Sequence, residues 1–145
     1  MKNDKVIETL LLSIPATLSN LTAIRHFVHA ALLPFCTDED FLYETVLAVE
    51  EAVTNIILHG YKEEVGIITI SIDFSEHFVE IVLKDTAPFF DPTTVPAPQL
   101  DVPLDDRQLG GLGVHIMRKY CDKIIHQRTE SGMNELILLK RFPKR

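Results

Sequence analysis

The feature of this sequence that most limits its fold is a proline-rich segment from Asp85 to Gln108. Five of the chain's eight prolines fall in it, and each one fixes φ and removes a backbone hydrogen-bond donor. No helix or strand is expected there, and a loop of this length within a compact domain is usually a lid or a disordered segment. The 145 residues suit one domain, 1–145, so the elements before and after the loop are expected to share one core.

Apolar spacing before the loop predicts strands and two helices. A cap at Ser19 or Asn20 opens the first helix, and a cap at Thr37 or Asp38 opens the second, which is expected to end on a left-handed Gly60. The predicted elements are a strand at 5–14, a helix from 21 to about 33, a long helix over 38–59, and a hairpin with strands at 68–74 and 78–84.

After the loop, a glycine cluster opens a short helix over 114–120. Two strands follow at about 123–129 and 134–141, with a turn through Ser131-Gly132. The resulting order β-α-α-β-β-loop-α-β-β is typical of an α+β two-layer sandwich, with helices on one face of a mostly antiparallel sheet.

Composition excludes several classes of protein. A hydrophobic share of 46% with 24% charged residues argues against wholesale disorder. No apolar run is long enough for a membrane span and the N-terminus lacks the core of a signal peptide, so we expect a cytoplasmic protein. Two cysteines are too few for a disulfide framework or a zinc cluster, and Cys36 and Cys121 are expected to be reduced, partly buried thiols.

The net charge of −7 disfavours direct binding of nucleic acid. Residues 37–51 hold six acids and no Lys or Arg, and residues 85–107 hold five acids and one Arg. An anionic ligand near these two segments would need a metal cation as mediator. From residue 107 to the end, nine Lys and Arg outnumber three acids, so this basic third is suited to phosphates or an acidic partner.

The first candidate site lies late in the long helix. At about 100° per residue, Glu51, Asn55 and His59 form one stripe, whereas Glu50 lies roughly 140° from Asn55. The functional interpretation is a carboxylate that takes a proton, one turn from an amide oxygen that ligates a hard cation. The alternative is a solvated helix face, which geometry alone favours.

Two further segments carry weaker signals. Asp85 stands where a strand enters a loop, which suits either a ligand-binding carboxylate or a plain turn. Arg107 precedes Gly110-Gly111-Leu112-Gly113, where backbone N–H groups at a helix start either bind an anion or form a simple turn. The pair His26 and His29 is expected to lie at the surface, because no further ligand has metal-site spacing.

Taken in order, these segments resemble the GHKL ATPase superfamily of gyrase, the heat-shock chaperone, histidine kinases and MutL. The N-box corresponds to Glu51–Asn55 with His59-Gly60, the first glycine box to Asp85-Thr86-Ala87, and the second to Gly110–Gly113. Within the superfamily, nearly the whole chain is most similar to the small single-domain serine kinases that act as anti-sigma factors in bacterial partner switching.

The resemblance implies a Bergerat-type two-layer α/β sandwich that binds ATP and Mg²⁺ between the long helix and the loop. Asn55 would ligate Mg²⁺, Asp85 would accept a hydrogen bond from the adenine amino group, and Glu51 would be the general base. Ala87 occupies a glycine position of the family, where its Cβ excludes most positive-φ conformations. The remaining nucleotide-binding residues would be Arg107, Gly110, Gly111, Leu112 and Gly113.

The function implied is that of an ATP- and Mg²⁺-dependent serine kinase that phosphorylates an anti-sigma-factor antagonist of the STAS type. A sigma factor is a second expected partner, and a homodimer is plausible by the same resemblance. The alternative is a non-catalytic module of the same fold, in which nucleotide tunes a protein interface. A weaker third hypothesis is slow hydrolysis of ATP, with Glu51 activating water.

Overall fold

The computed structural model describes residues 5–62, 64, 66–88 and 111–144. Most of the predicted proline-rich loop therefore lies outside the described residues. In chain order the elements are β1 (Glu8–Pro15), η1 (Leu18–Asn20), α1 (Leu21–Leu32), α2 (Glu39–Asn55), η2 (Ile56–Tyr61), β2 (Ile67–Phe74), β3 (Phe78–Asp85), α3 (Gly111–Tyr120), β4 (Lys123–Arg128) and β5 (Asn134–Arg141).

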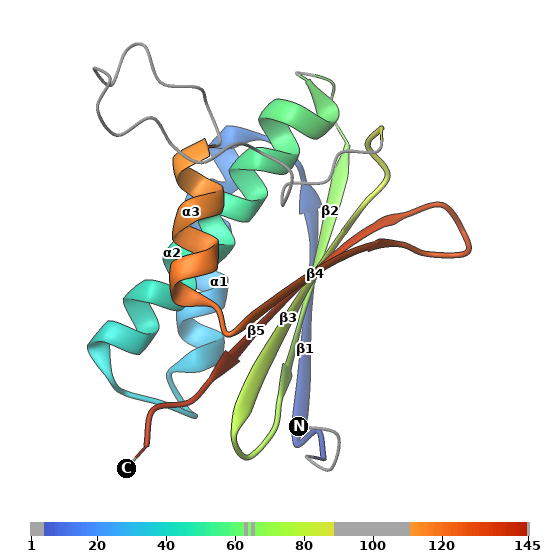
Figure 1. Ribbon diagram of the computed structural model, residues 1–145. Coiled ribbons are helices and arrows are strands. Elements are labelled where there is room, and N and C mark those ends of the chain that lie inside the picture. The colour runs from blue at the N-terminus through green and yellow to red at the C-terminus, as the bar shows by residue number, and fades with distance from the viewer. Residues whose placement is uncertain (1–4, 63, 65, 89–110, 145) are drawn as a thin grey trace.

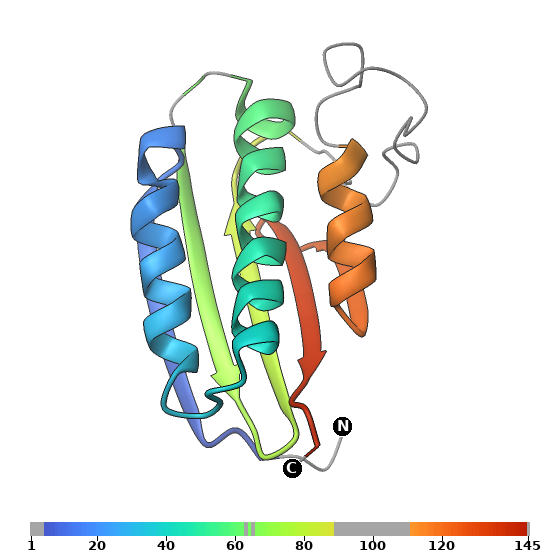
Figure 2. The same cartoon turned by 90° about the vertical axis from the view of Figure 1, so that its left-hand side faces the viewer.

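The strands form one antiparallel sheet in the order β1-β2-β3-β5-β4. Three helices, α1, α2 and α3, lie side by side over one face of it (Figures 1 and 2). This arrangement confirms the predicted α+β two-layer sandwich. Strand β5 pairs with β3 on one side and with β4 on the other, so the last strand stands inside the sheet rather than at its edge.

The core lies between the sheet and the helices, as the strand periodicity predicts. In β2, four alternate side chains point at the helices and are fully buried, whereas those between them are less buried. Burying one such side chain contributes about 1.5–3 kcal/mol. The four residues are Ile68, Ile70, Ile72 and Phe74.

Helix α2 begins and packs as the sequence predicts. The Asp38 side chain accepts a hydrogen bond from the Phe41 N–H at 2.8 Å, which caps the first turn. The predicted apolar stripe is buried along its whole length. Glu50 of α2 forms a partly exposed ion pair with Arg25 of α1 at 2.6 Å, so its carboxylate is engaged between the two helices.

The end of α2 differs from the prediction. The helix does not stop at a left-handed Gly60: it continues from Ile56 to Tyr61 as a π-helix, and the left-handed residue is Lys62, with φ of 51°. The π turn carries the chain past the glycine, and the buried Tyr61 anchors its end. Gly132 does adopt a positive φ, 87°, in the predicted turn between β4 and β5.

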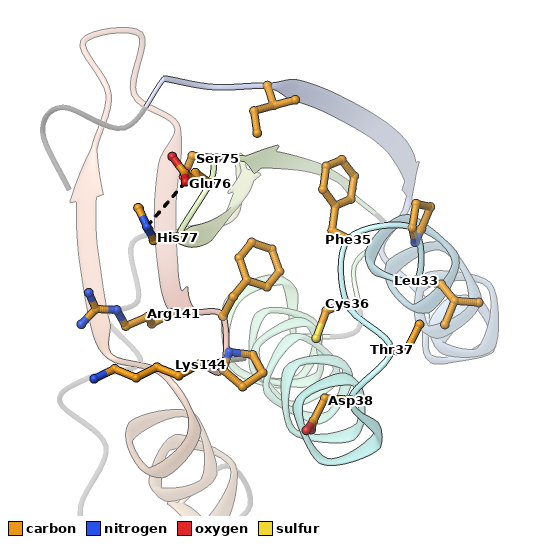
Figure 3. A pocket seen from close by; sticks show the side chains of 14 residues that line it. Leu33, Phe35, Cys36, Thr37, Asp38, Ser75, Glu76, His77, Arg141 and Lys144 are labelled. Atoms are coloured by element: carbon orange, nitrogen blue, oxygen red, sulfur yellow. Dashed lines mark ion pairs between the residues drawn. The ribbon is translucent and has the colours of Figure 1, made fainter.

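A hollow of about 1080 Å³ lies at the opposite end of the sheet from η2. Its wall comes from the α1–α2 connection, the β2–β3 turn and the C-terminal segment (Figure 3). Phe35 stacks there on Phe74 with ring centroids 4.0 Å apart. None of the site residues proposed from the sequence lines this hollow.

Other expectations from composition are tested by the described part of the chain. Both cysteines are free and partly buried, as predicted. His26 and His29 are exposed, and among the described residues no group of three His, Cys, Asp or Glu side chains could hold a metal ion. No described helix combines the length and the apolar character that a bilayer span requires.

Candidate functional site

Asn55, the last residue of α2, is the described residue whose buried side chain leaves two polar atoms without a hydrogen-bond partner. It is 1% exposed, and neither its Oδ1 nor its Nδ2 has a hydrogen-bond partner among the residues that the structure describes. Buried amides in native proteins nearly always have partners, and π turns in helices occur frequently at functional sites. The unpaired amide therefore indicates a site where a ligand supplies the missing partners of the Asn55 side chain.

Glu51 lies one helical turn before Asn55 and is half-buried. Burial raises the pKa of this carboxyl, and the negative charge of Glu50 raises it further. No described residue forms a hydrogen bond or an ion pair with the Glu51 carboxylate. Glu51 and Glu50 therefore differ as the helix geometry predicts: one carboxylate is paired with Arg25, and the other is available beside Asn55.

Asp85 ends β3 on the face of the sheet that the helices cover, and it is 4% exposed. Its Oδ1 accepts two hydrogen bonds of 2.9 Å, one from Asn134 Nδ2 and one from the Ala87 N–H. The pKa of Asp85 is raised overall, because the effect of burial outweighs the lowering by these two hydrogen bonds and by the charge of His126. The carboxylate is thus held in one orientation at the end of its strand.

Ala87 lies in the turn after Asp85 and closely approaches η2. Its φ is not positive, so the alanine adopts the turn without the strain that a left-handed conformation would impose. A Cβ built on Gly60 would lie 3.2 Å from the Ala87 Cβ, which is tighter than ordinary contact. Gly60 is therefore needed for close approach to Ala87 rather than for a helix cap.

Two residues of the site, Tyr61 and Asn134, were not among the site residues predicted from the sequence. Tyr61 holds the turn from the other side: its hydroxyl donates to the Ile67 carbonyl at 2.8 Å and accepts from the Thr86 N–H at 3.0 Å. Asn134 holds Asp85. The sequence offered one signal for Asn134. It is a polar residue at an inward-facing position of a strand whose next two inward-facing residues are Leu136 and Leu138.

The glycine region is described in part. Gly111 begins α3, and Leu112 and Gly113 lie in its first turn. The helix therefore exists as predicted but begins three residues before the predicted start at residue 114, inside the glycine cluster. Helix α3 packs alongside α2, and its N-terminus lies at the same end of the sandwich as η2 (Figures 1 and 2). Arg107 and Gly110 lie outside the described residues.

The model of one protein family, described as the histidine kinase-like ATPase domain, matches residues 14–140. The chain belongs to this family. Serine-protein kinase RsbW from two strains of Staphylococcus aureus, bovine RF122 / ET3-1 and MRSA252, is 30% identical over 126 residues, which cover 83% of this chain and 79% of the relative. These matches confirm the resemblance that the three motifs indicate.

A solved structure agrees with the fold. The crystal structure of the RsbU and RsbW domains of Rv1364c from Mycobacterium tuberculosis superposes with a TM-score of 0.66 at 17% identity. The match covers 95% of this chain and 34% of that longer chain. At this identity the likeness supports the shared sandwich, and the assignment of the family rests on the sequence matches.

Proposed function

We propose that this protein is a serine-protein kinase that uses ATP with Mg²⁺ and works as an anti-sigma factor or a similar partner-switching regulator. The observation that carries the proposal is the Asn55 amide, which is buried without a hydrogen-bond partner among the described residues, one turn from the half-buried Glu51. The family of ATPase domains and the serine-kinase relatives supply the class of reaction.

The donor set at the end of α2 fits a magnesium nucleotide. Mg²⁺ prefers oxygen ligands and keeps several of its waters, so the orphaned Oδ1 of Asn55 is a suitable single protein ligand. Asn55 would hold the cation, which would supply positive charge to the phosphates beside the acidic segment 37–51. The proposed set for the phosphates adds Arg107 and the backbone of 110–113.

The turn after β3 fits the base of the nucleotide. We assign Asp85 as the acceptor for the exocyclic amino group of adenine, because its carboxylate is buried and held in one orientation. We place Ala87 against the purine, since it is buried beside the same carboxylate and its N–H is already committed to Asp85.

Glu51 is the proposed general base. It would accept the proton of the attacking serine hydroxyl as that oxygen approaches the transferred phosphoryl group. Its raised pKa makes the ionised carboxylate a stronger base than an exposed glutamate. No other residue in our proposal handles the proton, so loss of this carboxylate should stop transfer without stopping binding.

The binding step is tested by titration calorimetry with ATP and Mg²⁺. Asn55→Ala should abolish binding, whereas the matched control Thr54→Ala, at the neighbouring half-buried position, should retain it. Circular dichroism checks that both variants fold. Absence of binding by the wild-type protein would refute the proposal.

The transfer step is tested with labelled ATP and a protein substrate. Glu51→Gln should bind ATP as the wild type does and produce no phosphoserine. Glu50→Gln is the matched control: it loses the solvent-screened ion pair with Arg25, which contributes little to stability, and it should keep transfer. Equal loss in the two variants would show that Glu51 has no special role.

The proposed protein substrate is an anti-sigma-factor antagonist of the STAS type, and a sigma factor is a proposed second partner. Incubation with candidate antagonists and labelled ATP tests the first, and co-purification without an antagonist tests the second. A homodimer belongs to the same proposal, and sedimentation equilibrium of the purified chain measures it.

The competing proposal is the non-catalytic module of the same fold, which Ala87 at a glycine position of the family favours. The close approach of Ala87 to Gly60 and its unstrained backbone support an intact nucleotide site instead. Phosphoserine on a partner protein would exclude the module, and ATP binding without transfer to any antagonist would favour it. Phosphate release without a partner would instead indicate hydrolysis with water as the nucleophile.

A further inference from the structure

Lys140 is a charged residue on the face of β5 that packs against the helices. The inward-facing residues before it are Leu136 and Leu138, which are buried. The Lys140 side chain is only 11% exposed. A lysine this deep in a protein is uncommon unless its charge is paired, so the groups around its ammonium group define its role.

The Lys140 ammonium group joins the two helices that carry the proposed nucleotide site. It donates a hydrogen bond of 2.5 Å to the carbonyl of Tyr120, the last residue of α3. It also donates to the Glu44 carboxylate of α2 at 3.3 Å. The ring centroids of Phe41 and Tyr120 lie 5.5 and 6.0 Å away, within the range of cation–π attraction. One cation of β5 therefore contacts both α2 and α3.

The chain that follows α3 is tied to the same part of β5. The Asp122 N–H donates to the Leu139 carbonyl at 2.8 Å, and the Asp122 carboxylate accepts from the Arg141 N–H at 2.6 Å. With the Lys140 contact, these hydrogen bonds attach the C-terminal end of α3 to three successive residues of β5. The end of the helix is thus fixed relative to the sheet and to α2.

The other end of α3 carries the backbone groups that we propose for the phosphates. Its first turn contains Gly111, Leu112 and Gly113 and lies at the same end of the sandwich as η2 (Figures 1 and 2). The helix has ten residues and is about 15 Å long. Because so short a helix moves as one stiff unit, a shift at Tyr120 also displaces the first turn. Hydrogen bonds to a charged group depend strongly on distance and angle.

We propose that Lys140 is a positioning residue of the nucleotide site: it fixes α3 against α2 and so holds the first turn of α3 where the phosphates require it. This inference rests on the proposed function, since it takes the phosphates of ATP as the group bound there. Lys140 lies at the opposite end of α3 from that turn and acts through the helix. A buried ion pair is weak evidence for stability, whereas a fixed position for α3 accounts for a lysine beside leucines.

Hydrogen exchange of the nucleotide-free protein tests the effect on α3. Lys140→Met keeps a long unbranched side chain and removes the charge. The backbone amides of α3 should exchange about 10-fold faster than in the wild type, which is the size of one hydrogen bond to a charged group. The amides of β2 should be unaffected. Lys140→Arg restores a cation and should give exchange rates closer to those of the wild type.

Nucleotide affinity tests the effect on the site. Calorimetry with Mg²⁺ compares ATP with adenosine, which has the base and the sugar but no phosphates. Lys140→Met should lower the ratio of ATP affinity to adenosine affinity about 10-fold, because the proposed contacts to the base come from Asp85 and Ala87 and not from α3. A general loss of structure would weaken the binding of both ligands and leave the ratio unchanged.

Lys84→Met is the matched control. Lys84 of β3 is also paired with a carboxylate, that of Glu135 at 3.8 Å, but it lies on the face of the sheet away from the helices. Its loss should change neither the exchange of α3 nor the affinity ratio.

Unchanged exchange in α3 or an unchanged affinity ratio in Lys140→Met would each overturn the inference. If that variant does not fold, Glu44→Gln, which removes the carboxylate partner of Lys140, carries the same two comparisons. Failure of the wild type to bind ATP at all would instead refute the proposed function.

Discussion

Replacing Asn55 by leucine should make the protein more stable and unable to bind nucleotide. The Asn55 amide is 1% exposed and unpartnered within the described residues. Leucine has the same branching and no polar atoms, so it removes the desolvated groups and keeps the packing. A residue kept for stability would show the opposite effect, because its loss would weaken the fold.

The size of the gain follows from the cost of the orphaned amide. Leaving a buried donor or acceptor unsatisfied costs about 1–3 kcal/mol, and this cost disappears in Asn55→Leu. For a domain of this length, 1 kcal/mol corresponds to roughly 4 °C in Tm. We therefore expect Asn55→Leu to raise the melting temperature of the nucleotide-free protein by about 4–12 °C.

Urea denaturation and thermal melting, each with and without ATP and Mg²⁺, measure both halves of the prediction. Without nucleotide, the midpoint of Asn55→Leu should exceed that of the wild type. With nucleotide, the wild-type midpoint should rise, because a ligand of the folded state stabilises it. The midpoint of Asn55→Leu should not move.

Thr45→Val provides the contrast. Thr45 is also buried in α2, but its hydroxyl donates to the Phe41 carbonyl at 2.6 Å, so its loss removes a satisfied hydrogen bond and should give no gain. If Asn55→Leu were destabilised as much as Thr45→Val or more, the amide must be satisfied in the folded protein. The argument for a ligand at Asn55 would then be wrong.

Three further predictions concern the surroundings of the site. A Cβ at Gly66 would lie 2.1 Å from the Tyr61 ring, so Gly66→Ala should displace the ring with its two hydroxyl hydrogen bonds and lower the unfolding free energy by about 2–4 kcal/mol. Urea denaturation should show a much smaller cost in a Tyr61→Ala background. Burial raises the pKa of Glu51, so the folded state keeps this proton to higher pH than the unfolded chain, and the side chain costs stability as pH rises through that interval. Glu51→Gln should therefore be more stable than the wild type at pH 7, and denaturation at a pH below the ordinary glutamate pKa should show the gain disappear. Gly60→Ala should weaken ATP binding in calorimetry, because its Cβ would lie 3.2 Å from that of Ala87, and adding Ala87→Gly should restore it; a double variant no better than Gly60→Ala would contradict this.

The elements of the fold were predictable because their signals are local. The stripe of α2, the Asp38 cap and the alternation of β2 each depend on residues within a few positions of one another. The separation of Glu50 from Glu51 also followed from helix geometry, and the Arg25 ion pair bears it out. The π turn after Asn55 left no pattern in the sequence, so the helix was predicted to end at Gly60, whereas α2 ends at Asn55 and η2 continues to Tyr61.

The site was predictable only in its single-segment parts. The helix places Glu51 beside Asn55 by spacing alone, but no spacing reveals that β5 pairs with β3. The contact of Asn134 with Asp85 depends on that pairing, and so it could not be read from either segment. The same holds for the close approach of Gly60 and Ala87, which come from η2 and from the turn after β3.

The place of β5 inside the sheet has a consequence for how the chain folds. Asp85 and Asn134 are 49 residues apart, and they meet only when the last strand inserts between β3 and β4. Contacts of such long range form late, because loop closure must precede them. If nucleotide binding depends on this contact, a partly paired sheet cannot bind nucleotide. Nucleotide should therefore slow unfolding and leave the folding rate almost unchanged.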